Sequence, residues 1–321
     1  MREYAYCTQC MKKTDYDNTI LACKKPGFFS LLKTDKSTIT SFSAYIRAKI
    51  HVIITFGMDT KALIRGIGMD IFDKSLSIIM PAYNEGASIY SNLMKTAETV
   101  STFHRNFEII AVNDGSEDQT EEEIRRATMQ DARIVLVSYM PNGGKGRAVK
   151  EGVLKAKGHY IAFLDADLDL SPAHLKEFLE KMDELKTEAV IGSKLHKDSK
   201  VNYPKRRKIM SFGYYLILLF LFHLPVKDTQ TGIKLFRADC LKKLISGVKS
   251  TGFAYDIEIL AKIAEQGGRI AEMPVVLEFQ RKNHWGRIRV GDVWLVVRDT
   301  MALYASMKRK RTVLNEKTTG V

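Results

Sequence analysis

Between residues 76 and 164, short apolar segments alternate with segments in which apolar residues recur at helical spacing. Apolar runs that end at polar turns are typical of buried strands, and here they predict strands at 76–80, 107–112, 133–138 and 159–164. The segments between them predict helices at 89–103, 120–129 and 148–156. Strands that alternate with helices form mostly parallel sheets. The sequence therefore predicts an α/β fold with a mostly parallel central sheet flanked by helices.

A polar segment follows each of the four expected strands. The carboxyl ends of parallel strands meet at one edge of a sheet, where such folds bind their ligands, so we expect the four segments to form one site. Any single polar loop at a strand end is explained equally well as an ordinary turn. The segments are Pro81-Ala-Tyr-Asn-Glu85, Asn113-Asp-Gly-Ser-Glu-Asp118, Met140-Pro-Asn-Gly-Gly-Lys-Gly-Arg147 and Asp165-Ala-Asp-Leu-Asp169.

The fourth segment places three carboxylates, Asp165, Asp167 and Asp169, directly after a wholly apolar strand. Carboxylates this close repel one another unless a cation or a set of donors compensates them. Hard oxygen ligands suit Mg²⁺ or Mn²⁺, and magnesium usually completes its shell with substrate phosphate oxygens. The segment therefore predicts a divalent metal site for a phosphorylated substrate.

Two other strand ends contain residues that suit a nucleotide. Lys145 stands among the glycines of Gly143-Gly-Lys-Gly146 before an expected helix, an arrangement that receives phosphate through backbone N–H groups, although these glycines also fit a plain tight turn. Asp114 has two interpretations: it accepts hydrogen bonds from a nucleobase or ribose, or it caps the helix that follows.

Together the four segments resemble the motifs of family 2 glycosyltransferases, which are inverting enzymes of the GT-A fold. The resemblance spans about residues 75–307. Further motifs resemble the branch that includes the dolichyl-phosphate mannose and glucose synthases. These are Ile191-Gly-Ser-Lys194, Arg207-Lys-Ile-Met-Ser211, Asp228-Thr-Gln-Thr-Gly-Ile-Lys-Leu-Phe236 and Phe253-Ala-Tyr-Asp-Ile-Glu258. The resemblance implies a Rossmann-like GT-A sheet.

The resemblance also implies roles for individual residues. The nucleoside would be bound by Pro81, Tyr83, Glu85 and Asp114, and the metal on the diphosphate by Asp165, Asp167 and Asp169. The acceptor phosphate would be bound by Lys194, Arg207 and Ser211, with Asp167, Arg207 and Lys194 as the catalytic set. Lys145 and Lys234 are candidate diphosphate contacts. Asp256 is left with two interpretations, which are a contact to sugar hydroxyls and a favourable charge at a helix N-terminus. The family usually has Gln in place of Asp169 and Arg in place of Lys194.

These parts imply transfer of a hexose from a nucleotide sugar of the UDP-glucose or GDP-mannose type to a polyprenyl or dolichyl phosphate, with inversion and with Mg²⁺ or Mn²⁺. An acceptor phosphate is already ionised at neutral pH, so the enzyme needs orientation and charge stabilisation rather than a strong base. One alternative is a family 2 transferase that acts on a sugar or glycolipid hydroxyl. Another is a nucleic-acid-binding protein, suggested by the net charge of +13, although no recognition motif for nucleic acid accompanies that charge.

The chain is expected to comprise an extension of unknown role at 1–72, a catalytic domain at 73–307 and a basic tail at 308–321. Within the extension, Cys7, Cys10 and Cys23 form either part of a metal knuckle or a coincidental cluster, because a structural zinc site needs four ligands.

No segment is long enough to span a bilayer, because the most apolar run, 212–224, has 13 residues where about 20 are needed. This run follows a basic cluster and predicts either a helix at a membrane interface or a core helix. We therefore expect a cytoplasmic enzyme that associates peripherally with the cytoplasmic face of a membrane.

Overall fold

The computed structural model describes residues 4–5, 14–15, 74–201, 205–222, 224, 226–252, 254–277 and 297–309. The chain divides into two compact units, Met1–Gly68 and Met69–Val321. In the first, β1 (Tyr4–Ala5) pairs antiparallel with β2 (Thr14–Asp15). The three cysteines of the extension and residues 310–321 of the expected tail lie outside the described residues.

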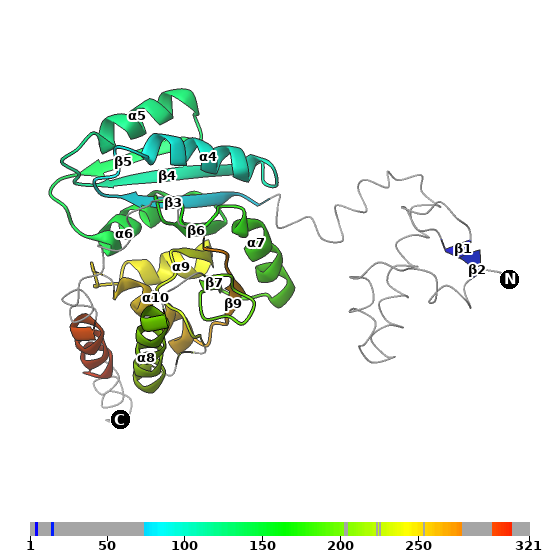
Figure 1. Ribbon diagram of the computed structural model, residues 1–321, viewed down its shortest axis with the longest axis vertical. Coiled ribbons are helices and arrows are strands. Elements are labelled where there is room, and N and C mark those ends of the chain that lie inside the picture. Colours follow the sequence, from blue (N-terminus) through cyan, green and yellow to red (C-terminus); the bar gives the residue numbers. More distant parts are fainter. Residues whose placement is uncertain are drawn as a thin grey trace, which may run out of the picture. The chain divides into compact units, whose positions relative to one another are not determined.

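The second unit is built on a seven-stranded sheet in the order β5-β4-β3-β6-β8-β7-β9. Neighbouring strands run parallel except where β8 pairs with β6 and β7. The expected mostly parallel α/β sheet is confirmed (Figure 1). Its strands are β3 (Leu76–Ala82), β4 (Phe107–Asp114), β5 (Ile134–Tyr139), β6 (Tyr160–Leu164), β7 (Ala189–Ser193), β8 (Ile233–Arg237) and β9 (Ile270–Pro274).

Helices cover both faces of this sheet because its central strands are apolar on both sides. On β3, Ile78 and Met80 face one core and Ile79 faces the other, as the two-residue period of a strand requires. The first core includes residues of α4 (Ile89–Ser101), α5 (Thr120–Gln130) and α7 (His174–Leu185). The second includes residues of α6 (Lys145–Lys155), α9 (Ala238–Ile245) and α10 (Tyr255–Glu265).

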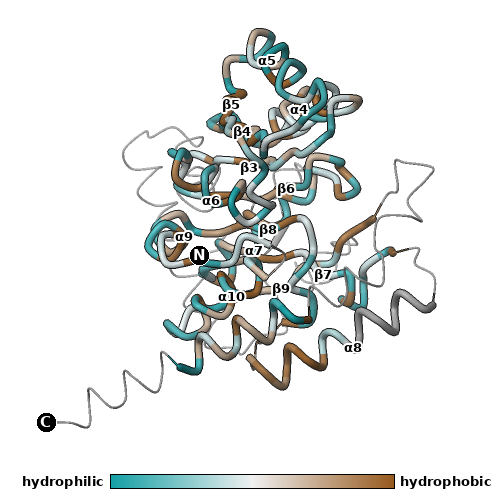
Figure 2. The backbone as a smooth tube through the Cα atoms, turned by 90° about the vertical axis from the view of Figure 1, so that its left-hand side faces the viewer, coloured by the Kyte–Doolittle hydropathy of each residue, from teal (hydrophilic) through white to brown (hydrophobic). Residues whose placement is uncertain are grey.

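The apolar run after residue 211 lies in α8 (Lys205–Phe222). Leu218 is buried, whereas four large apolar side chains of the same helix are exposed: Leu216, Ile217, Leu219 and Phe220. The described part of α8 therefore packs against the core through Leu218, Tyr214 and Phe222 and also exposes an apolar surface, so it has features of both expected alternatives. Figure 2 shows this apolar segment at the lower margin of the unit.

A second helical segment, residues 297–309, packs beside α8. The Tyr214 hydroxyl lies 2.9 Å from Thr300 Oγ1, and the rings of Phe222 and Tyr304 meet edge to face. None of the described helices is long and apolar enough to cross a membrane.

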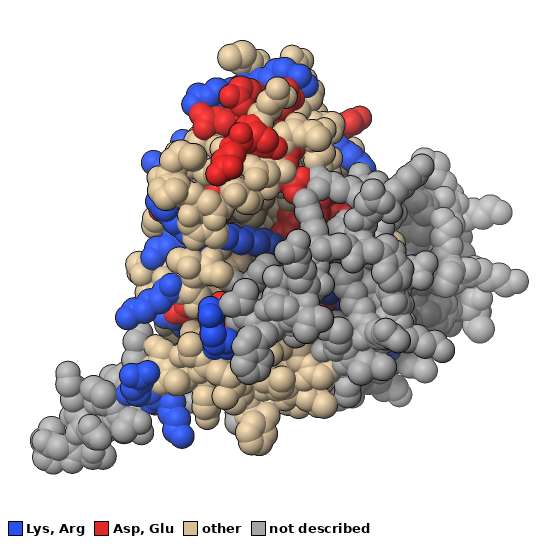
Figure 3. All heavy atoms as spheres, turned by 60° about the vertical axis from the view of Figure 1, so that its left-hand side comes forward, with Lys and Arg blue, Asp and Glu red and all other residues tan. Residues whose placement is uncertain are grey.

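Charge is unevenly distributed over the surface. Asp and Glu side chains gather in the upper part of the face shown in Figure 3, whereas Lys and Arg are spread over it from top to bottom. The first turn of α5 alone contributes Glu121, Glu122 and Glu123, which suit the positive end of a helix dipole. The excess of positive charge is therefore not spread evenly over this face.

Candidate active site

The loops that follow β3 and β4 are tied together by hydrogen bonds. Asn84, with a left-handed φ of 55°, donates its backbone N–H to Ser116 Oγ at 3.0 Å and accepts from the N–H of Glu117 at 3.0 Å. The N–H of Gly86 donates to Asp118 Oδ2 at 3.0 Å. Because parallel strands end at the same edge, these two loops form one wall of the candidate site.

The expected nucleoside-binding residues after β3 lie on this wall. Pro81 is within the last two residues of β3, and Tyr83 has a 46% exposed side chain, so its ring is available to a ligand. Glu85 is buried, and its backbone N–H donates to Thr120 Oγ1 at 2.8 Å. The first two residues thus border solvent, and Glu85 lies inside the loop.

Asp114 is buried at the end of β4, and three donors orient its carboxylate. The Tyr139 hydroxyl and the Gly143 N–H donate to Oδ1 at 2.7 and 2.8 Å, and Asn142 Nδ2 donates to Oδ2 at 3.0 Å. The capping interpretation is not what the structure shows, because Asp118 Oδ1 is the acceptor for the first N–H of α5. Asp114 is instead an oriented carboxylate at the end of the sheet.

Lys145 is the first residue of α6, and its Nζ lies 2.5 Å from Asp165 Oδ1. Burial by itself lowers the pKa of Lys145, but the charges of Asp165, Asp256 and Asp167 outweigh it and raise that pKa. The lysine from the glycine segment and the aspartates after β6 are thus brought together, as the strand-end argument predicts.

Asp167 is a partly buried carboxylate among other carboxylates. Burial, followed by the charges of Asp165, Asp169 and Glu85, raises the pKa of Asp167 to about 6. The backbone turns sharply here, because Leu168 has a left-handed φ of 52° and its N–H donates to the carbonyl of Asp165. A carboxylate held among like charges is one that a divalent cation would stabilise, so the donor set fits Mg²⁺ or Mn²⁺.

The expected three-ligand set is not preformed. Among the described residues, no three His, Cys, Asp or Glu side chains converge into a group that would hold a metal ion. Asp165 is instead paired with Lys145. Since magnesium is commonly held by one or two carboxylates together with substrate phosphates, the remaining ligands are those that a diphosphate would supply.

Lys234 and Asp256 form a buried ion pair beside this cluster. Lys234 Nζ lies 2.8 Å from Asp256 Oδ1 and donates to the carbonyl of Thr231 at 2.5 Å. Burial raises the pKa of Asp256, and the nearby ammonium groups of Lys234 and Lys145 oppose that rise. Asp256 lies in the first turn of α10, where a negative charge suits the helix dipole, but its carboxylate is also paired with Lys234.

Lys194 follows β7 and is held by Asp228, whose Oδ2 accepts the backbone N–H of Lys194 at 2.9 Å and lies 3.8 Å from its Nζ. Arg207 and Ser211 lie on α8, but their side chains are outside the described part of the structure. The proposed acceptor group is thus only partly described, and Lys194 is its anchored member.

A separate cavity lies between α10, the loop that precedes it and helix 297–309. Its volume is 1090 Å³, and none of the candidate residues named above lines it. The charged cluster at the strand ends, rather than this cavity, is therefore the candidate active site.

Three residues outside the predicted set of site residues also shape the site. A Cβ at Gly232 would overlap the carboxylate of Asp165, so only glycine allows that approach. Asp228 orients Lys194, and Glu258 holds the loop beside Lys145, as described below. Gly232 and Asp228 belong to one motif, Asp228-Thr-Gln-Thr-Gly232, whose spacing alone does not reveal two different partners.

Comparison with known proteins gives the same picture. The profile described as "Glycosyl transferase family 2" matches residues 77–245. Glycosyltransferase AglD of Haloferax volcanii is 29% identical over 202 residues, 62% of this chain and 32% of that protein. A dolichyl-phosphate beta-glucosyltransferase of Trichomonas vaginalis is 32% identical over 213 residues, 62% of each chain. The match thus spans about a third and about three fifths of these two relatives.

Solved structures share the fold. Glucosyl-3-phosphoglycerate synthase from Mycobacterium tuberculosis, in complex with Mn²⁺, UDP and glucosyl-3-phosphoglycerate, superposes with a TM-score of 0.56 at 19% identity. The superposition covers 73% of this chain and 79% of that one. At this identity the likeness concerns the fold alone.

Proposed function

The chain belongs to glycosyl transferase family 2, and from that premise we propose that it transfers a hexose from a nucleotide sugar to a polyprenyl or dolichyl phosphate with inversion. The single observation behind the lipid acceptor is the exposed apolar surface of α8. The name of the Trichomonas vaginalis relative, dolichyl-phosphate beta-glucosyltransferase, supports the same acceptor class.

The donor end of the site is proposed at the ends of β4 and β6. Asp114, held by Tyr139, Asn142 and Gly143, presents an oriented acceptor to a nucleobase. Lys145 supplies the cation for the diphosphate, and its raised pKa keeps it protonated at neutral pH. Pro81 and Tyr83 form the adjoining wall for the nucleoside.

Asp167, with Asp165 and Asp169 around it, is proposed to hold Mg²⁺ or Mn²⁺. The metal, when bound, would neutralise negative charge on the leaving diphosphate. The backbone N–H of Asp169 donates to Asp167 Oδ1 at 3.3 Å. The protein's own contribution is to orient Asp165 and Asp167 at the end of β6, which Gly232 permits by its missing side chain.

The acceptor end is proposed at Lys194, Arg207 and Ser211. Their task is to orient the lipid phosphate in line with the anomeric carbon, because the phosphate oxygen is ionised and needs no strong base. Asp256, fixed by Lys234, is proposed to accept hydrogen bonds from sugar hydroxyls. Lys234 is 1% exposed, so we assign it the holding of Asp256 rather than direct diphosphate contact.

The position of α8 links the acceptor to a membrane. Burial raises the pKa of Tyr214 on α8 to about 12, and the charges of Asp256 and Asp299 add to the rise. Beyond Tyr214 the helix exposes Leu216, Ile217 and Phe220. An apolar helix surface of this kind, preceded by basic residues, fits the interface of a bilayer in which a lipid phosphate would reside.

The proposal is tested by incubating the full chain with phospholipid vesicles, dolichyl phosphate and radiolabelled UDP-glucose, GDP-mannose or UDP-N-acetylglucosamine. We expect label from one donor to enter the organic phase only with Mg²⁺ or Mn²⁺ and only with dolichyl phosphate. Asp167→Asn and added chelator should each abolish the transfer. Label that stays wholly in the aqueous phase for every donor would contradict the lipid acceptor.

A further inference from the structure

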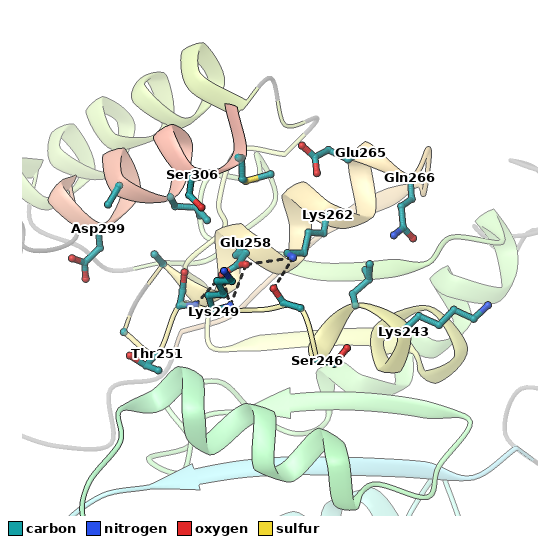
Figure 4. A pocket seen from close by; sticks show the side chains of 18 of the residues that line it. Lys243, Ser246, Lys249, Thr251, Glu258, Lys262, Glu265, Gln266, Asp299 and Ser306 are labelled. Atoms are coloured by element: carbon teal, nitrogen blue, oxygen red, sulfur yellow. Dashed lines mark hydrogen bonds and ion pairs between the residues drawn. The ribbon is translucent and has the colours of Figure 1, made fainter. Parts of the chain in front are cut away.

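Glu258 is a buried carboxylate in α10 whose contacts are all with the preceding loop or its own helix. Its Oε2 accepts the backbone N–H groups of Lys249 at 3.0 Å and Ser250 at 2.9 Å, and Oε1 lies 3.4 Å from Lys262 Nζ (Figure 4). Lys262 in turn donates to the carbonyl of Gly247 at 2.8 Å. One carboxylate and one ammonium on α10 therefore hold the loop at residues 247–250.

This loop depends on such polar contacts because it has no core on one side. Lys249, Ser250 and Thr251 line the 1090 Å³ cavity, with helix 297–309 across from them (Figure 4). A loop beside a cavity lacks the packing that fixes a buried segment. Val248 packs into the core and Lys150 Nζ donates to its carbonyl, so Glu258 is one of several restraints on the loop. Its hydrogen bonds are to an ionised acceptor, which makes them about twice as strong as those to a neutral one.

The other side of the loop lies against the start of α6. The N–H of Gly146 donates to the carbonyl of Thr251 at 2.7 Å. A Cβ at Gly146 would lie 2.6 Å from the carbonyl oxygen of Ser250, and one at Gly144 would lie 2.8 Å from that of Thr251. The glycines on both sides of Lys145 are thus pressed against the loop that Glu258 holds.

We propose that Glu258 is a positioning residue for Lys145, acting through the Ser250–Thr251 backbone and its hydrogen bond to Gly146. The inference rests on the proposed function in one respect, which is that Lys145 binds the donor diphosphate. This role differs from simple stabilisation of the α10 dipole. A negative charge in the first turn of a helix stabilises that helix without holding the loop that contacts Gly146. Asp256, in the same turn, is held by Lys234 and is proposed to contact the sugar, whereas Glu258 holds the loop. The two acidic residues therefore have separate tasks.

The test measures nucleotide affinity rather than lipid transfer, so failure of the acceptor assignment leaves it intact. Titration calorimetry with Mn²⁺ compares UDP with UMP, and GDP with GMP, for the full chain and for Glu258→Gln. We expect Glu258→Gln to weaken binding of the diphosphate roughly tenfold, about 1.4 kcal/mol, and to change binding of the monophosphate little. Glu265→Gln, at the exposed end of the same helix, is the matched control and should leave both affinities unchanged.

A double-mutant cycle separates positioning from general loosening of the fold. In a Lys145→Met background, Glu258→Gln should have no further effect on diphosphate affinity, since its target is gone. Gly146→Ala would displace the same loop from the α6 side. It is a second variant for the case in which Glu258→Gln folds poorly, and we expect the same loss of diphosphate affinity. Equal losses for diphosphate and monophosphate, an undiminished effect in Lys145→Met, or no diphosphate binding by the unaltered chain would each overturn the proposal.

Discussion

Lys145 Nζ and Asp165 Oδ1 lie 2.5 Å apart, joining the first residue of α6 to the end of β6. The Lys145 ammonium is thus paired with a carboxylate that the sequence predicts to be a metal ligand. Binding of a metal and a diphosphate would then exchange partners, with Lys145 moving to phosphate oxygens and Asp165 becoming available to the cation. Two charges that satisfy each other in the free protein are thus also the two that a metal diphosphate would separate.

Replacing Lys145 by Met should lower kcat/KM for transfer roughly hundredfold, since one cation on the leaving group is lost. The same variant should bind Mn²⁺ more tightly than the unaltered chain in the absence of nucleotide, because Asp165 no longer has a competing ammonium. Calorimetric titration of Mn²⁺ alone checks the second point. Lys155→Met, an exposed lysine in the last turn of the same helix, is the control. Weaker Mn²⁺ binding by Lys145→Met would contradict the exchange.

The pKa of Asp167, raised to about 6 from 3.8, gives a prediction about stability without metal. The folded state holds this proton more tightly than the unfolded chain, so stability falls as pH rises from about 4 to about 6 and the cost persists above that window. Asp167→Asn should therefore raise the Tm at pH 7.5 in chelator and lose this advantage near pH 4. Thermal unfolding followed by circular dichroism measures both values. A lower Tm for Asp167→Asn than for the unaltered chain at pH 7.5 would show that the charge of Asp167 does not destabilise the fold.

The buried pair of Lys234 and Asp256 should be sensitive to the loss of one partner. Lys234→Met leaves a carboxylate buried without its nearest cation, which typically costs about 3–5 kcal/mol. Adding Asp256→Asn should recover part of that loss, because the amide does not carry an uncompensated charge. Urea unfolding of the two single variants and the double variant gives the coupling, and losses that simply add would show that the pair is not coupled.

Gly232 provides a test of the space beside Asp165. Gly232→Ala would push the carboxylate away from the end of β6 and should lower metal-dependent transfer while the protein stays folded. Gly213 on α8 is the matched control, because a Cβ there meets nothing within 4 Å. Gly213→Ala should be neutral or stabilise the helix by about 1 kcal/mol. Equal activity of the two variants would remove the steric argument.

The parallel half of the fold was predictable from local patterns. The strand expected at 76–80 is β3, and the helix expected at 120–129 is α5, each within two residues at either end. The strand is mostly apolar and the helix is amphipathic, so the pattern of apolar residues alone identifies them. By contrast β8, which runs antiparallel between β6 and β7, was not anticipated, because a five-residue segment does not reveal its partners.

The site was predictable to a similar degree. Because both segments follow parallel strands, the sequence predicted that Lys145 would lie near Asp165, 20 residues away in the chain. It did not predict that Asp228 would hold Lys194 from 34 residues away, or that the loop carbonyl of Thr251 would meet Gly146. Such contacts depend on how separate segments pack in three dimensions, and polar residues in loops give no period from which that packing could be read.

Phe220 offers the sharpest test of the membrane assignment, because its side chain is 81% exposed on α8. Phe220→Glu should weaken binding to anionic phospholipid vesicles several-fold and lower transfer to dolichyl phosphate, since a charge on the apolar surface opposes insertion into the interface. Affinity for UDP or GDP should not change. Met129→Glu on α5 is the matched control, with an 86% exposed side chain at a distant helix. Vesicle co-sedimentation measures the effect. If the two variants sediment alike, α8 is not the membrane-binding surface, and the acceptor must reach Lys194 from another side.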